Sequence, residues 1–177
     1  TKQQFGFEHF NERPEGEEIS LLVIHNISLP AGQFGTGDVD ALFCGTLDCC
    51  KHPSYQDLEG CVFLRTSLLT ESDAVPVRFL FGPSLAAGVS SFEGRENCND
   101  FSIGVELEGT DSTPYERVQY ETLARLTDAL AEAYPIKYVT GHSMIAPLRK
   151  TDPGPAFDWL MYESLCKTGK PLCFPYV

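Results

Sequence analysis

The stretch from Ile19 to Leu29, ISLLVIHNISL, limits the possible folds more than any other part of the chain. A continuous run rich in Ile, Leu and Val is typical of a strand buried on both faces, as at the centre of a sheet covered by helices. The apolar run breaks at His25 and Asn26. We therefore expect a central strand that ends in two polar side chains.

Two further strands are predicted downstream. In FSIGVELEGT, residues 101–110, alternation sends Ile103, Val105 and Leu107 to one face and Ser102, Gly104, Glu106 and Glu108 to the other. Glu106 is therefore placed in the middle of a strand. IKYVTGH, residues 136–142, predicts a third strand with His142 at its carboxyl end.

Helical patterns alternate with these strands. The strongest runs from Thr113 to Pro135, with Thr113 as cap, Pro114 in the first position, Glu116 in a capping box and an apolar stripe of Leu123, Leu126, Leu130 and Tyr134. Residues 39–47 predict a short helix or turn. A final helix over residues 156–167 is expected to turn Phe157, Leu160 and Leu165 inward. This alternation indicates an α/β or α+β sheet protein.

Composition limits the class of protein. A chain of 177 residues fits one domain, 1–177, with an irregular lead-in over 1–18 and a tail over 168–177. The net charge of −12 argues against nucleic acid as a partner. No apolar run approaches the roughly 20 residues that cross a membrane. The first 18 residues lack the pattern of a secretory signal, and seven cysteines without scaffold spacing suit a reducing compartment, so we expect a cytoplasmic protein.

Five chemically active side chains fall at strand ends, in mid-strand or in the proline-rich loop: His25, Glu106, His142, Lys150 and Asp152. Two imidazoles and one carboxylate form a standard ligand set for a catalytic zinc ion, with one position left open for water. A nearby carboxylate, Glu106, suits proton transfer from that water. A cation, Lys150, suits stabilisation of a developing oxyanion.

Each residue also has a purely structural interpretation. Either histidine can be a hydrogen-bonded core residue. Glu106 can lie on the wet face of a sheet, and Lys150 with Asp152 can form a solvated ion pair. A cluster of Cys49, Cys50 and His52 is a weaker alternative metal site, because adjacent cysteines rarely reach one ion.

Long strings of the sequence resemble a known family. They are LLVIHNISLPAGQFGTG, GRENCNDFSIGVELEGTD, TGH and IAPLRKTDPGPAFDW. All closely resemble the AmpD family of bacterial cytosolic 1,6-anhydro-N-acetylmuramoyl-L-alanine amidases. The resemblance covers roughly residues 13–159, except for one central segment.

The resemblance implies an α/β fold, a mixed β-sheet flanked by helices. It implies one Zn²⁺ held by His25, His142 and Asp152, a catalytic role for Glu106, oxyanion stabilisation by Lys150, and Asn26 close to the substrate. The implied reaction cuts the lactyl amide between anhydro-muramic acid and L-alanine in muropeptides during cell-wall recycling. We expect a monomer whose partner is the anhydro-muropeptide. The alternatives are a non-catalytic muropeptide-binding module and a zinc endopeptidase acting on the stem peptide.

Residues 60–87 depart from the family. The family resembles VRVSAHFLI and QFVSCxxRAWHAG there, whereas this chain reads GCVFLRTSLLTESDAVPVRFLFGPSLAA. Suitable codons for residues 60–67, read two bases later, encode VRVSAHF. Codons for residues 76–86, read one base later, encode QFVSCSGRAW. We therefore hypothesise that this segment is a frame-shifted reading, which resequencing of the gene tests.

Overall fold

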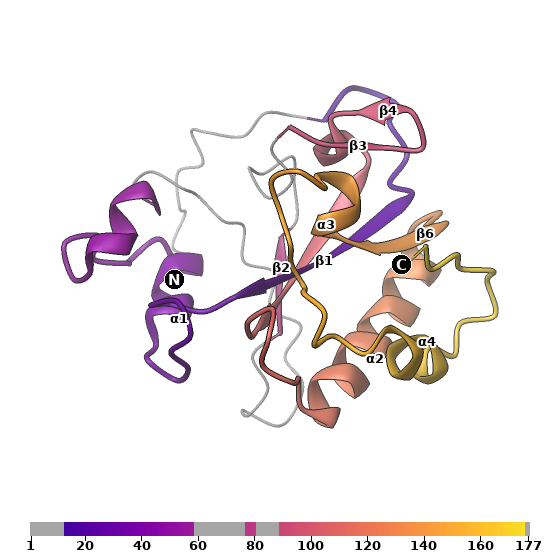
Figure 1. The fold of residues 1–177 in the computed structure, drawn as a ribbon. Helices are drawn as coiled ribbons and strands as arrows, with labels where there is room; N and C mark the ends of the chain where they lie inside the picture. The colour runs from indigo at the N-terminus through magenta and orange to yellow at the C-terminus, as the bar shows by residue number, and fades with distance from the viewer. Residues whose placement is uncertain (1–12, 59–76, 81–88, 176–177) are drawn as a thin grey trace, which may run out of the picture.

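The structure, a computed structural model, describes residues 13–58, 77–80 and 89–175 (Figure 1). Its main sheet has four strands in the order β2-β5-β1-β6. At the centre, β1 (Leu21–Ile27) runs parallel to both β5 (Ser102–Glu108) and β6 (Tyr138–Gly141). The edge strand β2 (Val77–Leu80) is antiparallel to β5. The sheet is thus mixed, as expected, and its central strand is the apolar run from which the prediction began.

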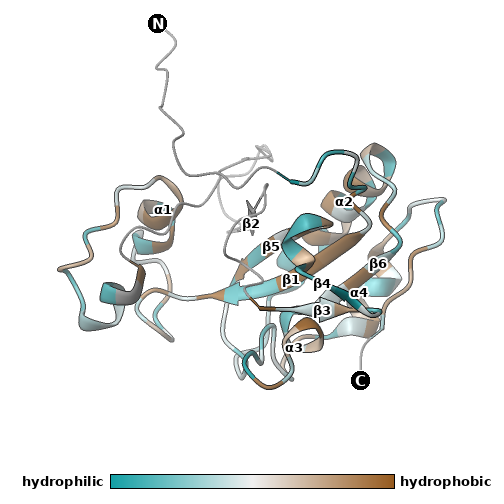
Figure 2. Cartoon of the chain, turned by 90° about the horizontal axis from the view of Figure 1, so that it is seen from above, coloured by the Kyte–Doolittle hydropathy of each residue, from teal (hydrophilic) through white to brown (hydrophobic). Residues whose placement is uncertain are grey.

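Helices cover both faces of this sheet (Figures 1 and 2). On one face, α2 (Arg117–Ala133) and α4 (Trp159–Leu165) pack on the odd-numbered apolar residues of β5 and on Leu22 and Ile24 of β1. On the other face, Leu21 and Val23 pack on α3 (His142–Ile145) and on the hairpin of β3 (Ser91–Phe92) and β4 (Arg95–Glu96). The short helix η2 (Cys98–Asp100) precedes β5. Burial on both faces explains the unbroken apolar sequence of β1.

A smaller apolar cluster lies beyond the carboxyl end of β1 (Figure 1). It contains α1 (Asp38–Phe43), the predicted short helix, and η1 (Pro53–Leu58). Tyr55 is fully buried there and donates its hydroxyl to Asp38 at 2.9 Å, which raises the Tyr55 pKa to about 12 through burial and the neighbouring carboxylate. This cluster anchors the loop that leaves the strand next to His25 and Asn26.

The predicted start of α2 is wrong by one turn. The Thr113 backbone N–H donates to the hydroxyl of Thr110 at 3.1 Å, so Thr113 closes a turn instead of capping a helix. The helix begins after Glu116, whose backbone N–H donates to Oε1 of Gln119 at 2.9 Å in a capping box one turn later than expected. Tyr115, which precedes the first turn, is buried.

Two details of the C-terminal part also differ from the prediction. Leu160 was expected to face inward but is 69% exposed, and Tyr162 is the fully buried residue of α4. The predicted tail is tied to the sheet, because Cys173 exchanges backbone hydrogen bonds with Lys137 and Val139 at 2.9 Å.

In the lead-in, residues 1–12 lie outside the described part. Of the unusual segment 60–87, only β2 is described, so the frame-shift hypothesis stays a prediction.

Candidate metal centre

The carboxyl ends of the parallel strands bring three predicted site residues to one edge of the sheet. His25 on β1 is in register with Glu106 on β5, and Ile24 is in register with Gly141, the last residue of β6. Residues in register on neighbouring parallel strands share a face and lie about 5 Å apart. His142 follows Gly141 directly, so it emerges beside His25.

The loop between α3 and α4, here called the ligand loop, supplies Asp152 as the third member of a tight cluster. Nδ1 of His25 lies 3.0 Å from Nδ1 of His142 and 3.2 Å from Oδ2 of Asp152. Nδ1 of His142 lies 3.0 Å from the same Oδ2. Ligand atoms about 2.0–2.1 Å from a tetrahedral zinc ion are separated by about 3.3 Å, so these three atoms have the spacing of one face of a zinc site. Among the described residues this is the one group of His, Cys, Asp or Glu side chains with such convergence.

Hydrogen bonds alone do not account for the cluster. If His25 donates its Nδ1 proton, Nδ1 of His142 and Oδ2 of Asp152 face one another at 3.0 Å as two acceptors. If both rings donate to the carboxylate, the two N–H groups face one another at 3.0 Å. No protonation pattern satisfies all three contacts at once, whereas one cation placed among three lone pairs does.

Electrostatics keep this donor set ready for a cation. Burial lowers the pKa of His25, which favours the neutral ring with a free lone pair. Burial acts to raise the pKa of Asp152, but hydrogen bonds from His142 and His25 outweigh it and hold the pKa below the usual range. Asp152 is therefore an ionised carboxylate beside at least one neutral imidazole.

Glu106 faces the same site. Its side chain is buried, with 8% exposure, and its Oε2 atom has no hydrogen-bond partner among the described residues. Burial raises the Glu106 pKa well above the ordinary 4.5, the charge of Asp152 adds to the rise, and Lys150 opposes it. The structure therefore excludes the alternative of a carboxylate on a wet sheet face. A buried carboxyl with a raised pKa is suited to proton transfer near neutral pH.

Lys150 and Asn26 line a hollow beside the cluster. The positive charge of Lys150 lowers the pKa of both His25 and Glu106, so its ammonium group acts on the site. Asp152 pairs with the two histidines and forms no ion pair with Lys150 in the described structure, which excludes the solvated pair. The hollow has a volume of about 490 Å³ and also contains Asp152 in its lining.

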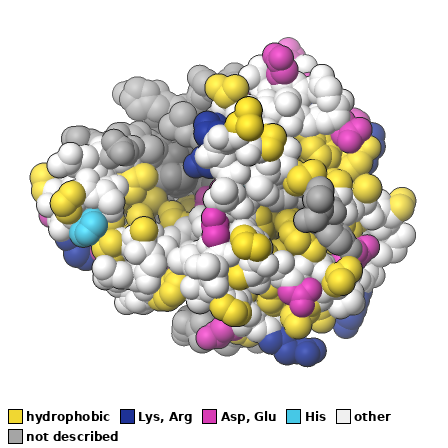
Figure 3. Space-filling model, in the orientation of Figure 1, with side chains coloured by type: hydrophobic (Ala, Val, Ile, Leu, Met, Phe, Trp, Pro, Cys, Tyr) yellow, Lys and Arg dark blue, Asp and Glu magenta, His cyan; other side chains and the backbone are white. Residues whose placement is uncertain are grey.

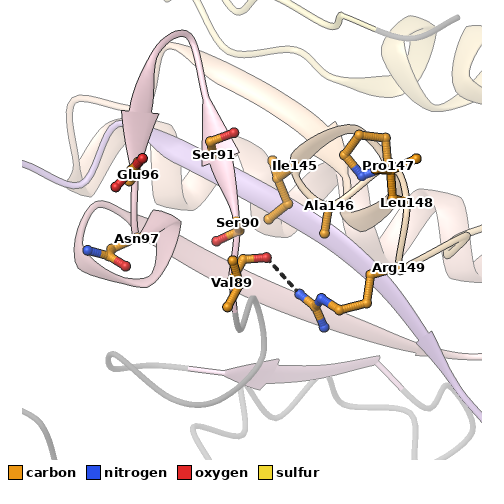
Figure 4. A pocket seen from close by; sticks show the side chains of 10 residues that line it. All are labelled: Val89, Ser90, Ser91, Glu96, Asn97, Ile145, Ala146, Pro147, Leu148 and Arg149. Atoms are coloured by element: carbon orange, nitrogen blue, oxygen red, sulfur yellow. Dashed lines mark hydrogen bonds between the residues drawn. The ribbon is translucent and has the colours of Figure 1, made fainter.

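A second hollow lies on the other side of Arg149. It has a volume of about 440 Å³ and opens between the β3–β4 hairpin and the end of α3 (Figure 4). Arg149 lines both hollows and donates from Nη2 to the backbone oxygen of Val89 at 3.0 Å. In the space-filling view, the molecule is also hollowed between the part that carries α1 and η1, at the left, and the body of the sheet (Figure 3). The surface around the site therefore has room for an extended ligand.

Two residues near the site were not predicted. Asp111 accepts a hydrogen bond from Nδ2 of Asn26 at 2.9 Å, and the Tyr115 hydroxyl donates to the backbone oxygen of Pro153 at 2.9 Å. Asp111 follows the string VELEGT at the carboxyl end of β5, at the same sheet edge, and this position was the available signal. Nothing in the sequence indicated that Tyr115 lies near the site, because it falls within the segment expected to be helical.

The alternative metal site is not supported. His52 instead contacts Oγ of Ser54 through Nδ1 at 2.8 Å, and Cys49 and Cys50 belong to no ligand cluster in the described part of the chain. Cys50, Cys98, Cys166 and Cys173 are free thiols. Among the described helices, none combines the length and the apolar character that crossing a membrane requires.

Comparisons with known proteins agree with this geometry. Residues 15–155 match the family model described as N-acetylmuramoyl-L-alanine amidase. The 1,6-anhydro-N-acetylmuramyl-L-alanine amidase AmpD of Escherichia coli is 50% identical over 163 residues, which cover 89% of this chain and 87% of that protein. The Enterobacter cloacae protein of the same name is 49% identical over 164 residues, 90% of this chain and 87% of that protein.

Solved structures give the same result. The crystal structure of a selenomethionine AmpD derivative aligns with a TM-score of 0.76 at 45% identity, covering 90% of both chains. The complex of E. coli AmiD with anhydro-N-acetylmuramic acid-L-Ala-D-gamma-Glu-L-Lys aligns with a TM-score of 0.57 at 26% identity, covering 88% of this chain and 61% of that one.

Proposed function

The chain belongs to the N-acetylmuramoyl-L-alanine amidase family, and on that premise we propose that it hydrolyses the lactyl amide of anhydro-muropeptides during cell-wall recycling. The bond cut joins 1,6-anhydro-N-acetylmuramic acid to the L-alanine of the stem peptide. Relatives of about 50% identity carry the name of this activity. The observation that carries the proposal is the convergence of two imidazoles and one carboxylate within 3.0–3.2 Å.

The proposed metal is one zinc ion held by His25, His142 and Asp152. Its support is the donor chemistry of the cluster, since imidazole and carboxylate in this number are typical of catalytic zinc sites. When bound, zinc supplies Lewis-acid chemistry, polarising a carbonyl group and lowering the pKa of water.

The remaining roles go to residues of the chain. Glu106 takes the proton of the attacking water and returns it to the leaving amine, for which a raised pKa and a buried position are suited. Lys150 presents a positive charge to the oxyanion that develops on the lactyl carbonyl. Asn26 lines the hollow beside these groups and contacts the substrate.

We further propose that the chain is a single domain that works as a cytoplasmic monomer on its small muropeptide substrate. The cysteines support this setting, because Cys50, Cys98, Cys166 and Cys173 are free thiols. The acidic net charge of −12 supports a partner other than nucleic acid.

The test measures zinc content and the products formed from anhydro-muropeptide, with and without a chelator. We expect one zinc per chain and chelator-sensitive release of intact peptide from the anhydro-sugar. A shortened peptide still attached to the sugar would instead identify an endopeptidase, and binding without cleavage would identify a binding module.

A matched pair of variants connects the activity to the cluster. His142→Ala removes one of three converging ligand atoms, so we expect loss of both zinc and turnover. His52→Ala removes a histidine that contacts Ser54 outside the cluster, so zinc content and turnover should stay at the native level. Full zinc content in His142→Ala would contradict the proposed ligand set.

A further inference from the structure

One carboxylate bonds the chain neighbours of two proposed ligands. Oδ1 of Asp111 accepts a hydrogen bond at 2.9 Å from Nδ2 of Asn26, the residue that follows His25. Oδ2 of Asp111 accepts a hydrogen bond at 2.5 Å from the hydroxyl of Thr151, the residue that precedes Asp152. Asp111 thus connects the end of β1 to the loop that carries the carboxylate ligand.

The backbone reinforces this connection. The backbone oxygen of Asp111 accepts a hydrogen bond from the N–H of Ala156 at 3.0 Å. Gly154 packs so closely that a Cβ atom there would lie 2.2 Å from Cα of Asp111, and its φ of +83° also favours glycine. The loop on the C-terminal side of Asp152 is therefore held against Asp111 as well.

Asn26 closes a ring of contacts around the ligand. Its amide group also donates to the backbone oxygen of Pro153 at 3.2 Å, the residue that follows Asp152. Both neighbours of Asp152 are therefore bonded within the same network. Removal of the Asp111 carboxylate leaves the Thr151 hydroxyl and one Asn26 N–H without their acceptor.

The second ring nitrogen of His25 makes this network important for the orientation of the ring. In many metal sites, the second ring nitrogen of a histidine ligand donates to a carboxylate or carbonyl that fixes the ring. Nε2 of His25 is buried and has no hydrogen-bond partner among the described residues. Within the described part of the chain, the orientation of His25 rests on its strand, on the Nδ1 contacts with His142 and Asp152, and on the contacts of its neighbour Asn26.

We propose that Asp111 is a positioning residue that holds His25 and Asp152 at ligand spacing through Asn26 and Thr151. The proposal rests on the zinc amidase function proposed above, since it requires a metal at this cluster. Asp111 itself ligates no metal and touches no reacting atom. Its effect is on metal affinity and coordination geometry, and turnover changes only as a consequence.

The test measures Zn²⁺ affinity by competition with a chromophoric chelator, and the visible absorption of the Co²⁺-loaded chain. Loss of a direct outer partner of a metal ligand costs about 10–100-fold in metal affinity. Asp111 acts one bond further out, through Asn26 and Thr151, so we expect a loss near the low end of that range, about 10-fold, for Asp111→Ala together with an altered Co²⁺ spectrum. Asp111→Asn should recover most of the affinity, because its amide oxygen still accepts from Asn26 while the Thr151 hydroxyl rotates to accept from its NH₂ group.

Asp128→Ala is the control for a merely structural role. The Asp128 carboxylate likewise joins two segments, accepting from the backbone N–H groups of Lys167 and Thr168 at 2.9 and 2.8 Å, but lies outside the metal cluster. We expect this variant to lose stability while keeping native Zn²⁺ affinity and a native Co²⁺ spectrum. An equal loss of affinity in Asp128→Ala and Asp111→Ala would overturn the proposal.

The remaining outcomes separate the two proposals. If the native chain binds no Zn²⁺, the proposed function fails, and the inference fails with it. If the native chain binds Zn²⁺ and Asp111→Ala binds it equally well with an unchanged Co²⁺ spectrum, the inference alone is wrong. If Asp111→Ala does not fold, Thr151→Val decides, because it removes only the hydroxyl donor: a weaker affinity supports the proposal and native affinity overturns it.

Discussion

Replacement of Glu106 by glutamine separates chemistry from metal binding. Glutamine has nearly the same shape, so the buried site stays filled, but it cannot accept and return a proton. General acid–base groups contribute about 10²–10⁴-fold to rate, so we expect turnover of anhydro-muropeptide to fall by that factor. The corresponding rise in the activation barrier is about 3–5 kcal/mol. Zinc content should stay at the native level, because Glu106 is not among the three converging ligand atoms.

The same variant should become relatively more stable as pH rises. Burial raises the Glu106 pKa above its ordinary 4.5, so the folded chain holds this proton more tightly than the unfolded chain does. The stability that Glu106 contributes is therefore fully present below about pH 4.5 and is lost as pH rises through the raised pKa. Urea unfolding of the metal-free proteins across this pH range measures the free energy of unfolding. The value for Glu106→Gln minus the value for the native chain should increase as pH rises.

Glu108 provides the control on the same strand. Its Oε1 accepts a hydrogen bond from the backbone N–H of Gly35 at 2.8 Å, and a glutamine oxygen preserves this contact. Glu108→Gln should therefore keep native turnover. Native turnover in Glu106→Gln with zinc bound, or equal losses in both variants, would refute the assignment of Glu106 as the proton-transfer group.

Two further predictions concern stability and the ligand loop. The Thr127 hydroxyl donates to the backbone oxygen of Leu123 at 2.9 Å and meets the fully buried hydroxyl of Tyr162 at 2.6 Å. Thr127→Val leaves the Tyr162 hydroxyl unpaired and should lower the free energy of unfolding by about 1–3 kcal/mol, whereas Tyr162→Phe should lower it by about 0.5–1.5 kcal/mol. Chemical denaturation measures both values. A larger loss in Tyr162→Phe than in Thr127→Val would contradict this account of the hydrogen bond. Gly154→Ala should weaken zinc affinity, measured by chelator competition, because its Cβ would collide with the Asp111 backbone 2.2 Å away. Unchanged affinity would show that the ligand loop adapts.

The sequence was a good guide wherever the signal was local. The apolar run from Ile19 to Leu29 indicated a doubly buried strand because both of its faces must avoid water. The break at His25, the mid-strand position of Glu106 and the strand end before His142 indicated which side chains could meet. The assignment of partners among these residues needed the family resemblance as well, since several pairings were compatible with spacing alone.

Local patterns failed where tertiary contacts override them. Thr113 and Pro114 have the composition of a helix start, yet Tyr115 is drawn into the core and the helix begins after Glu116. Leu160 follows an apolar pattern but is exposed, because the short α4 turns Tyr162 to the core instead. Neither outcome can be read from periodicity, since packing partners distant in sequence decide it.

The sequence by itself therefore determined the class of fold, the family and the identity of the candidate ligands. Only the tertiary structure decided that His25, His142 and Asp152 bring their ligand atoms to 3.0–3.2 Å from one another. It also revealed Asp111 between the neighbours of two ligands. The physical reason is that parallel register and loop packing set distances between residues far apart in the chain, and local sequence carries no record of such distances.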